Sequence, residues 1–241
     1  MLLAASNEFN IPEIKLIRAI HDAPSILDRM NFGKEKYLSY LQTALLRRVM
    51  NGNVVYHGLA GHFLLKGIPH VLMIRIMANM EDRIAEEMAR ENINEKEALH
   101  ILRKDDQERR AWSRYVFNAD PWSPELYHCV FKIGKCSVDD VVNAIVKLVQ
   151  QSRFQSTPSL QKLLNDKLLA SQAKASLLPK FPKVKTTCNE GVVRVYLNVP
   201  RLRKQNTIRE IRKLLGKSGI DCRTDILVNQ PKPIDNNIQI I

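Results

Sequence analysis

The amino-acid sequence predicts an α/β fold, with helices around a parallel sheet, followed by a small α+β domain. Strand-like apolar runs alternate with helical patterns through residues 1–150, which is the order of a parallel sheet with crossover helices. Residues 151–159 are polar and contain a proline, as is typical of a linker. A helix, a hairpin, a second helix and a strand fill residues 160–229. Residues 230–241, with two prolines and two adjacent asparagines, are expected to form a flexible tail.

The first domain opens with helical patterns and then becomes strand-like. Apolar residues at helical spacing predict helices near 11–22 and 34–50, followed by a short β-rich run at Val54–Tyr56. The run Val71–Met77 is almost continuously apolar, which is typical of a strand covered on both faces in a parallel sheet. The remaining elements expected in this domain are helices at 80–91, 95–117 and 138–150 and a strand at 127–133.

Side chains that can cap a helix precede these three helices. Asn79 and Asp82 have the three-residue spacing of a capping box, as do Asn94 and Glu97. Ser137 is expected to cap the third helix.

The second domain is predicted from a hairpin placed between two helices. Asn189-Glu190-Gly191 is the expected turn. The elements around it are a helix at 160–178, strands at 183–188 and 192–199, a helix at 206–217 and a strand at 220–228.

Positive charge is concentrated in the C-terminal third of the chain. The sequence has 37 Lys and Arg and 25 Asp and Glu, a net charge of +12. Residues 1–152 hold 20 basic and 19 acidic side chains, whereas residues 153–241 hold 17 and 6. Such a module can attract phosphate-rich partners, or it can be a well-solvated surface without one. Because no aromatic stacking surface accompanies the charge, we expect no specific nucleic-acid recognition.

Several other classes of protein have no support in the sequence. No apolar run has the length of a membrane span, and the first residues lack a signal-peptide pattern, so we expect a cytoplasmic protein. The cysteines and histidines show no metal-ligand spacing, so no metal site is expected. No G-x-S-x-G turn indicates a hydrolase.

Three segments of the first domain combine strand-like runs with glycines or charged residues. The first is Val54–Gly61, in which a β-rich run leads into a glycine turn. The second is Val71–Ala78 followed by Asn79–Ile84, an apolar strand leading into a charged helix. The third is Leu102–Arg110, followed by a strand and the helix after Ser137. In this order they resemble the cytidylate-kinase-like branch of the nucleoside monophosphate kinases, over roughly residues 1–150.

This resemblance implies an incomplete P-loop-kinase-like sheet and transfer of a phosphoryl group from ATP to a CMP-like nucleoside monophosphate, with Mg²⁺. In this family the third segment forms the lid, so Arg103, Arg109 and Arg110 are expected to grip phosphates and Asp106 to orient one of them. Arginine suits this role because its planar fork holds phosphate oxygens in a fixed geometry. The alternative is a solvated helix in which Asp106 pairs with Arg109 or Arg110.

Two features depart from the family pattern. Gly58 and Gly61 are the expected nucleotide-binding glycines, but Leu59 stands where the family normally has an arginine. No G-x-x-x-x-G-K-[ST] loop occurs, so the phosphates of ATP lack an evident binding loop. A sheet without the strand that precedes this loop would leave backbone groups unpaired and apolar faces exposed. Either the chain begins further upstream, or a partner supplies the strand, or the domain is a non-catalytic pseudokinase scaffold.

The second domain has a resemblance of its own. A helix that includes Asp166–Ala170, a hairpin over Val184–Val195 with glycine at its turn, and a final helix and strand resemble a BON domain. This resemblance implies binding to phospholipid surfaces or to other proteins, and a homo-oligomer is compatible with the sequence. Arg209, Arg212 and Lys213 share one face of the predicted helix and are the expected anion-binding residues.

Overall fold

The computed structural model describes residues 2–16, 33–220 and 224–228. These residues fall into two compact units, which are described separately. The composite unit contains the described parts of residues 1–19, 27–56 and 156–241, and the central unit contains residues 57–155. Residues 33–56 thus group with the described C-terminal residues, although a single boundary at 151–159 was expected. The predicted domains at 1–150 and 160–229, with a linker at 151–159, remain predictions.

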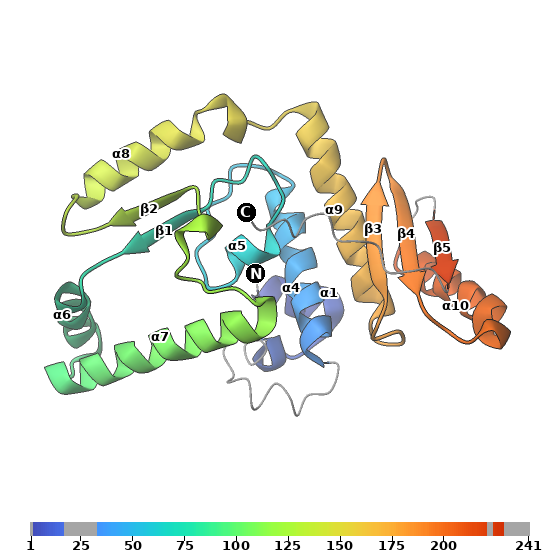
Figure 1. Ribbon diagram of the computed structural model, residues 1–241, viewed down its shortest axis with the longest axis horizontal. Helices are drawn as coiled ribbons and strands as arrows, with labels where there is room; N and C mark the ends of the chain where they lie inside the picture. The colour runs from blue at the N-terminus through green and yellow to red at the C-terminus, as the bar shows by residue number, and fades with distance from the viewer. Residues whose placement is uncertain (1, 17–32, 221–223, 229–241) are drawn as a thin grey trace. The chain divides into compact units, whose positions relative to one another are not determined.

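The sheet of the composite unit has three strands in the order β3-β4-β5 (Figure 1). β3 (Lys185–Asn189) is antiparallel to β4 (Val192–Leu197), and β5 (Thr224–Val228) is parallel to β4. Alternate residues of β4 are buried, as a strand with one covered face requires. The residues that share this core are Val193, Val195 and Leu197 of β4, Ala173 and Leu177 of α9 (Pro158–Leu177), and Ile211 and Leu215 of α10 (Lys204–Lys217).

Because α9 and α10 contribute to one core with the same face of β4, both helices cover that face. A short 3₁₀ helix, η3 (Arg201–Arg203), precedes α10. The predicted order of helix, hairpin, helix and strand is confirmed. The identification of this part as a BON domain remains a prediction.

The hairpin turn between β3 and β4 forms where the sequence predicts it. Glu190 has φ 52° and Gly191 has φ 74°, which are the two left-handed positions of a type I′ turn. The carboxylate of Asp166 on α9 accepts the backbone N–H groups of Glu190 and Gly191, each at 2.8 Å. A side chain of α9 therefore fixes the turn to the helix beneath it.

Two N-terminal helices complete the composite unit. α1 (Leu2–Phe9) packs on α4 (Gly33–Val49), with the rings of Phe9 and Tyr40 stacked at 4.1 Å. α4 packs in turn on α9, where the buried hydroxyls of Thr43 and Ser171 are 2.7 Å apart. Of the helix predicted near 11–22, residues 13–16 are helical and the rest lies outside the described residues. α1 was not predicted as a separate helix.

The central unit is built on two parallel strands. β1 (Ile74–Met77) pairs with β2 (Cys129–Lys132), and α6 (Met80–Glu91) and α7 (Glu95–Phe117) form the connection between them. α8 (Val138–Val149) follows β2, and Figure 1 shows α7 and α8 on either side of the strand pair. The short helices of this unit are α5 (Gly61–Leu64), η1 (Pro124–Leu126) and η2 (Ser152–Phe154).

Aromatic side chains fix the C-terminal end of α7 against α5. Trp112 is 2% exposed, and its ring meets that of Phe117 edge to face, with centroids 5.5 Å apart. Phe117 stacks on Phe63 at 4.3 Å. These contacts determine where the charged residues of α7 lie within the unit.

Two strand predictions for the first 150 residues were wrong. Residues 54–56 form no strand, and Val55 is 99% exposed. The run at 71–77 is not covered on both faces, because Ile76 on β1 is 57% exposed. Within the described residues, β1 has β2 as its one strand neighbour, so its other edge is unpaired. The face that carries Ile76 is only partly covered by other elements.

The predicted helix caps formed in two cases of three. Asn94 with Glu97, and Ser137 with Asp140, each form a reciprocal capping box. Asn79 lies at the N-cap of α6, but its side chain makes no capping hydrogen bond. A Cβ atom on Gly134 would lie 3.1 Å from Asp82 Oδ2 and 3.7 Å from Asn79 Nδ2, so both side chains are directed toward the loop after β2 instead.

No helix in the described parts of the chain combines the length and the hydropathy that a membrane span requires. A cytoplasmic location remains a prediction.

Candidate functional site

The four residues predicted for the phosphate-gripping lid lie in the middle of α7. Arg103, Asp106, Arg109 and Arg110 belong to one continuous helix of 23 residues. Ala98 and Trp112 of this helix are buried, whereas Ile101 and Tyr115 are exposed. Asp106 has a partner on α6, Arg110 has one in the loop before β2, and Arg109 has one on α7 itself.

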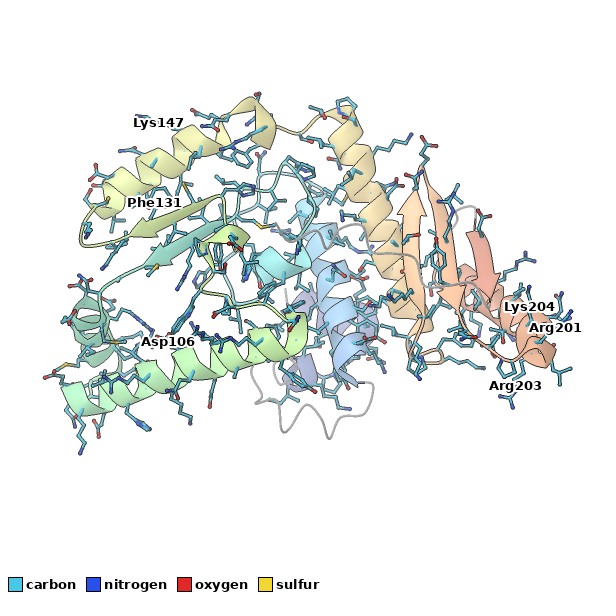
Figure 2. All side chains as sticks on the ribbon, viewed as in Figure 1. Asp106, Phe131, Lys147, Arg201, Arg203 and Lys204 are labelled. Carbon is cyan, nitrogen blue, oxygen red and sulfur yellow. The ribbon has the colours of Figure 1, made fainter. Side chains whose placement is uncertain are left out.

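Asp106 pairs with an arginine of the neighbouring helix. Arg83 on α6 donates from both terminal nitrogens to the two oxygens of Asp106, at 2.7 and 3.0 Å (Figure 2). This bidentate geometry is the one that gives arginine its specificity for carboxylates and phosphates. The hydrogen bond to Asp106 raises the pKa of Arg83. Asp106 was expected to orient one of the three arginines, and the alternative was an ion pair with Arg109 or Arg110. In the described residues its partner is Arg83 instead.

Arg110 and Arg114 converge on a second carboxylate. Arg110 Nε donates to both oxygens of Asp120, at 3.0 and 3.1 Å, and Arg114 donates to one of them at 2.7 Å. The backbone N–H of Trp122 adds a third donor at 3.1 Å. The hydrogen bonds from Arg110, with those from Trp122 and Arg114, hold the pKa of Asp120 well below its usual range. Asp120 is therefore an anion bound by two guanidinium groups, which is the surrounding that a phosphate group needs.

Trp122 links this cluster to the sheet. The guanidinium carbon of Arg110 lies 4.2 Å from the centre of the Trp122 ring, a cation–π contact. Arg75 on β1 donates to the carbonyl oxygen of Trp122 at 2.8 Å. The loop from 118 to 123 is thus attached both to α7 and to β1. We call Arg75, Arg110, Arg114, Asp120 and Trp122 the arginine cluster.

Arg103 and Arg109 do not join the arginine cluster. Both side chains are exposed. Arg109 faces Asp105 one turn earlier at 3.7 Å, a surface pair of the kind that contributes little to stability. The alternative of intrahelical ion pairs therefore applies to Arg109, although its partner is Asp105 and not Asp106.

The sequence analysis did not single out Arg75, Arg114 and Asp120, and gave Arg83 no role. A signal was present, since Arg110 and Arg114 have the i,i+4 spacing of neighbours on a helix face. Asp120 begins an Asp-Pro-Trp turn directly after α7. Spacing alone could not show that this turn folds back on the helix.

The predicted glycine turn leads into α5. Gly61 is buried and is the first residue of α5, where its carbonyl oxygen accepts the N–H of Leu65. Gly58 lies in a bend that no strand precedes. A nucleotide-binding role for Gly58 and Gly61 remains a prediction.

His62 on α5 packs beside Tyr127 within the same unit. Burial lowers the pKa of His62 to about 4, so its ring is neutral at physiological pH. The Tyr127 hydroxyl donates to the carbonyl oxygen of Pro121 at 2.9 Å and lies 3.4 Å from His62 Nε2. No group of three or more His, Cys, Asp or Glu side chains in the described segments is arranged to hold a metal ion.

The predicted anion-binding residues lie on the solvent side of α10. Arg209, Arg212 and Lys213 are exposed, whereas Ile211 and Leu215 on the other side of the helix are in the core. A shallow hollow on this side is lined by Gln205, Ile208, Arg209 and Arg212. Their role in binding anions remains a prediction.

Comparison with known proteins gives one match. A model of the cytidylate kinase-like family matches residues 1–135, which include the arginine cluster and the Arg83–Asp106 pair. No curated protein and no solved structure is significantly similar to the chain. Since the matched residues are more than half of the 241 in the chain, this protein belongs to the cytidylate kinase-like family.

Proposed function

We propose that the central unit binds a nucleoside monophosphate and takes part in phosphoryl transfer to it from ATP. The observation that carries this proposal is the arginine cluster, in which Arg110 and Arg114 hold the carboxylate of Asp120 as they would hold a phosphate. Phosphoryl transfer asks a protein mainly for positioning and for positive charge around the moving group. The family match supports the same class of reaction.

In this proposal the arginines exchange one anion for another. Without nucleotide, Asp120 occupies the guanidinium groups of Arg110 and Arg114. A phosphate with more oxygens and more charge competes for them, and Arg75, which donates to the carbonyl oxygen of Trp122, adds a further cation. Arg83 remains with Asp106 and keeps α6 and α7 together. Arg103 and Arg109 are exposed, and the surface pair between Arg109 and Asp105 is weak enough to give way to the phosphates of a second nucleotide.

The donor side requires a phosphate-binding loop that the printed sequence does not contain. β1 is paired with β2 on one edge, and in the part of the chain that the structure describes no strand covers its other edge. Ile76 is also 57% exposed. Further polypeptide that adds a parallel strand at this edge would bring the loop with it. Mg²⁺ would arrive with ATP, since in kinases it is held largely by the phosphates and by one or two carboxylates.

A second candidate function is that of a non-catalytic scaffold whose basic C-terminal part recruits an anionic or protein partner. The specific observation in its favour is that Arg83, Arg110 and Arg114 are all bound to internal carboxylates. Such pairs also hold helices and loops together without any ligand.

Calorimetric titration of the full chain with CMP and with Mg-ATP tests the proposal. CMP is expected to bind, and Arg110→Gln is expected to weaken its binding about ten-fold or more, as the loss of a charged hydrogen bond implies. Lys147→Gln, which removes an exposed cation of α8 in the same unit (Figure 2), is the matched control and should bind CMP as the unmodified chain does.

Asp120→Asn separates the two candidate functions. If Arg110 and Arg114 serve a phosphate, removing the competing charge of Asp120 should tighten CMP binding. If they serve only the fold, the variant should lose stability and gain no affinity. Absence of CMP binding to the folded chain would contradict the proposal. Micromolar binding of Mg-ATP would show that the chain has a donor site of its own.

A further inference from the structure

Helix α8 carries apolar side chains on its solvent side as well as on its inner side. Of its 12 residues, all but two aspartates, one asparagine and one lysine are apolar. Val141 on the inner side is 3% exposed. Four other valines are largely open to solvent, and we call them the valine stripe: Val138 at 61%, Val142 at 50%, Val146 at 46% and Val149 at 44%.

The valine stripe runs along the whole length of one side of α8. At 3.6 residues per turn, its spacings of four, four and three residues place all four side chains within an arc of about 80°. From Val138 to Val149 the helix rises about 16 Å. Single exposed apolar residues are normal on a protein surface, whereas a contiguous apolar patch marks an interaction site.

Valine is a poor residue for the solvent side of a helix. Its branched side chain is restricted by the preceding turn, so it lowers helix stability relative to alanine, glutamate or lysine. Those residues are the usual choice where packing does not decide. Four valines on one exposed side are therefore favourable only where another surface removes them from water.

The charges of α8 indicate what covers the valine stripe. The helix has two carboxylates, on Asp139 and Asp140, and one cation, on Lys147. A helix that lies on a membrane has lysines and arginines beside its apolar face, so this helix fits a protein partner better than a lipid surface. Asp139 and Lys147 are both exposed, near opposite ends of α8 (Figure 2), and both flank the stripe on the same side.

We propose that the valine stripe binds the valine stripe of a second copy of this chain, with the two α8 helices antiparallel about a two-fold axis. In such an interface the same patch is used on both subunits. With Val138 opposite the partner's Val149, Asp139 lies within one residue of the level of the partner's Lys147, and the axis repeats this pair. The antiparallel arrangement also places each helix N-terminus beside a C-terminus of opposite partial charge.

A parallel arrangement of the two helices is less favourable. It would place Asp139 beside its own copy and Lys147 beside its own copy, so that like charges meet at both ends. The size of the contact determines its strength. A standard interface buries about 800 Å² of each partner, and one pair of helices about 18 Å long supplies less than this. The dimer is therefore weak and reversible.

Sedimentation equilibrium of the full chain, from about 1 to about 500 µM, tests the proposal. A reversible monomer–dimer equilibrium is expected. Val142→Ala with Val146→Ala should raise the dissociation constant at least about ten-fold, because four valine side chains per dimer lose apolar surface. Val55→Ala, which makes the same change at a valine that is 99% exposed outside α8, is the matched control and should dimerise as the unmodified chain does.

The same alanine variant separates dimerisation from folding. Alanine is the better helix former, so its melting temperature at about 1 µM, where the chain is monomeric, should be unchanged or raised. A lowered melting temperature at this concentration would show that the valines are covered within the chain, and would overturn the proposal.

Charge reversal tests the antiparallel pairing. Asp139→Lys and Lys147→Glu should each dimerise several-fold less well, because each brings like charges together across the axis. An equimolar mixture of the two variants should regain the affinity of the unmodified chain, since opposite charges then meet at both ends. The separate and mixed samples contain the same chains, so an effect of either substitution on folding cannot produce this difference.

Two further outcomes would contradict the proposal. One is a chain that stays monomeric throughout the concentration range, and the other is a dimer whose affinity changes with neither the alanine substitutions nor the mixing of charges. The valine stripe shares no residue with the arginine cluster, and dimerisation does not depend on phosphoryl transfer. Failure of either proposal therefore leaves the other intact.

Discussion

The buried contact between Thr43 and Ser171 provides a direct test of how α4 packs on α9. The Thr43 hydroxyl donates to the carbonyl oxygen of Ser39 at 2.9 Å, so its single proton is already used. At 2.7 Å, Ser171 must therefore be the donor in the contact between the two hydroxyls. Thr43 is 0% exposed and Ser171 6% exposed, so water cannot replace either partner.

This geometry predicts unequal costs for the two single substitutions. Thr43→Val keeps the shape of the side chain but leaves the Ser171 hydroxyl without its acceptor, which should cost about 1–3 kcal/mol of unfolding free energy. Ser171→Ala leaves Thr43 still bonded to Ser39 and should cost about 1 kcal/mol or less. The double variant buries no unpaired hydroxyl, so its cost should be about 1 kcal/mol smaller than the sum of the two.

Urea unfolding followed by far-UV circular dichroism measures these free energies. Both tryptophans of the chain, Trp112 and Trp122, lie in the central unit, so their fluorescence gives an internal control. Strict additivity of the two substitutions would refute the contact, and with it the packing of α4 on α9.

Three further predictions follow from single residues. Asp166→Ala should lower the stability of the composite unit by about 1–3 kcal/mol, because two N–H groups of the hairpin turn lose a charged acceptor. Amide exchange at Glu190 and Gly191 should accelerate, and unchanged exchange there would contradict the role of Asp166. Gly134→Ala should destabilise the central unit by about 2 kcal/mol, measured by unfolding followed through tryptophan fluorescence. Gly134 has φ +96°, and a Cβ atom there would lie 3.1 Å from an oxygen of Asp82. A neutral effect would show that the turn can relax. Burial lowers the pKa of His62 from its ordinary 6.5 to about 4. The unfolded chain therefore takes up the proton first, and the central unit should lose stability as the pH falls from about 6.5 to about 4. His62→Phe should flatten this pH dependence, and an equally steep profile in that variant would assign the dependence to another group.

Local hydrogen bonding explains which parts of the fold were predictable. The bounds of α6 and α7 agree with those expected from the sequence, and the capping boxes at Asn94 and Ser137 formed. So did the turn at Glu190 and Gly191. In each case the residues that decide the structure lie within a few positions of one another, so their spacing in the sequence is also their spacing in space.

The failures involve elements whose partners lie far away in the chain. The run at 54–56 has strand-forming residues, but no strand of the described residues lies beside it. Asn79 turns toward Gly134 and not toward its own helix. A strand needs a neighbour to satisfy its backbone groups, and a side chain takes the better of its available contacts. Neither choice can be derived from the local sequence.

The same distinction between local and long-range features applies to the candidate site. The sequence by itself determined that arginines and carboxylates occur on two consecutive helices, that positive charge is concentrated after residue 152, and that the first domain resembles the cytidylate-kinase-like enzymes. Only the tertiary structure decided that Asp106 faces Arg83, that Asp120 folds back on Arg110, and that α4 packs on α9. The physical reason is that an ion pair or a packed interface depends on the path of the backbone between its partners, and that path is set by the sum of all burial in the unit.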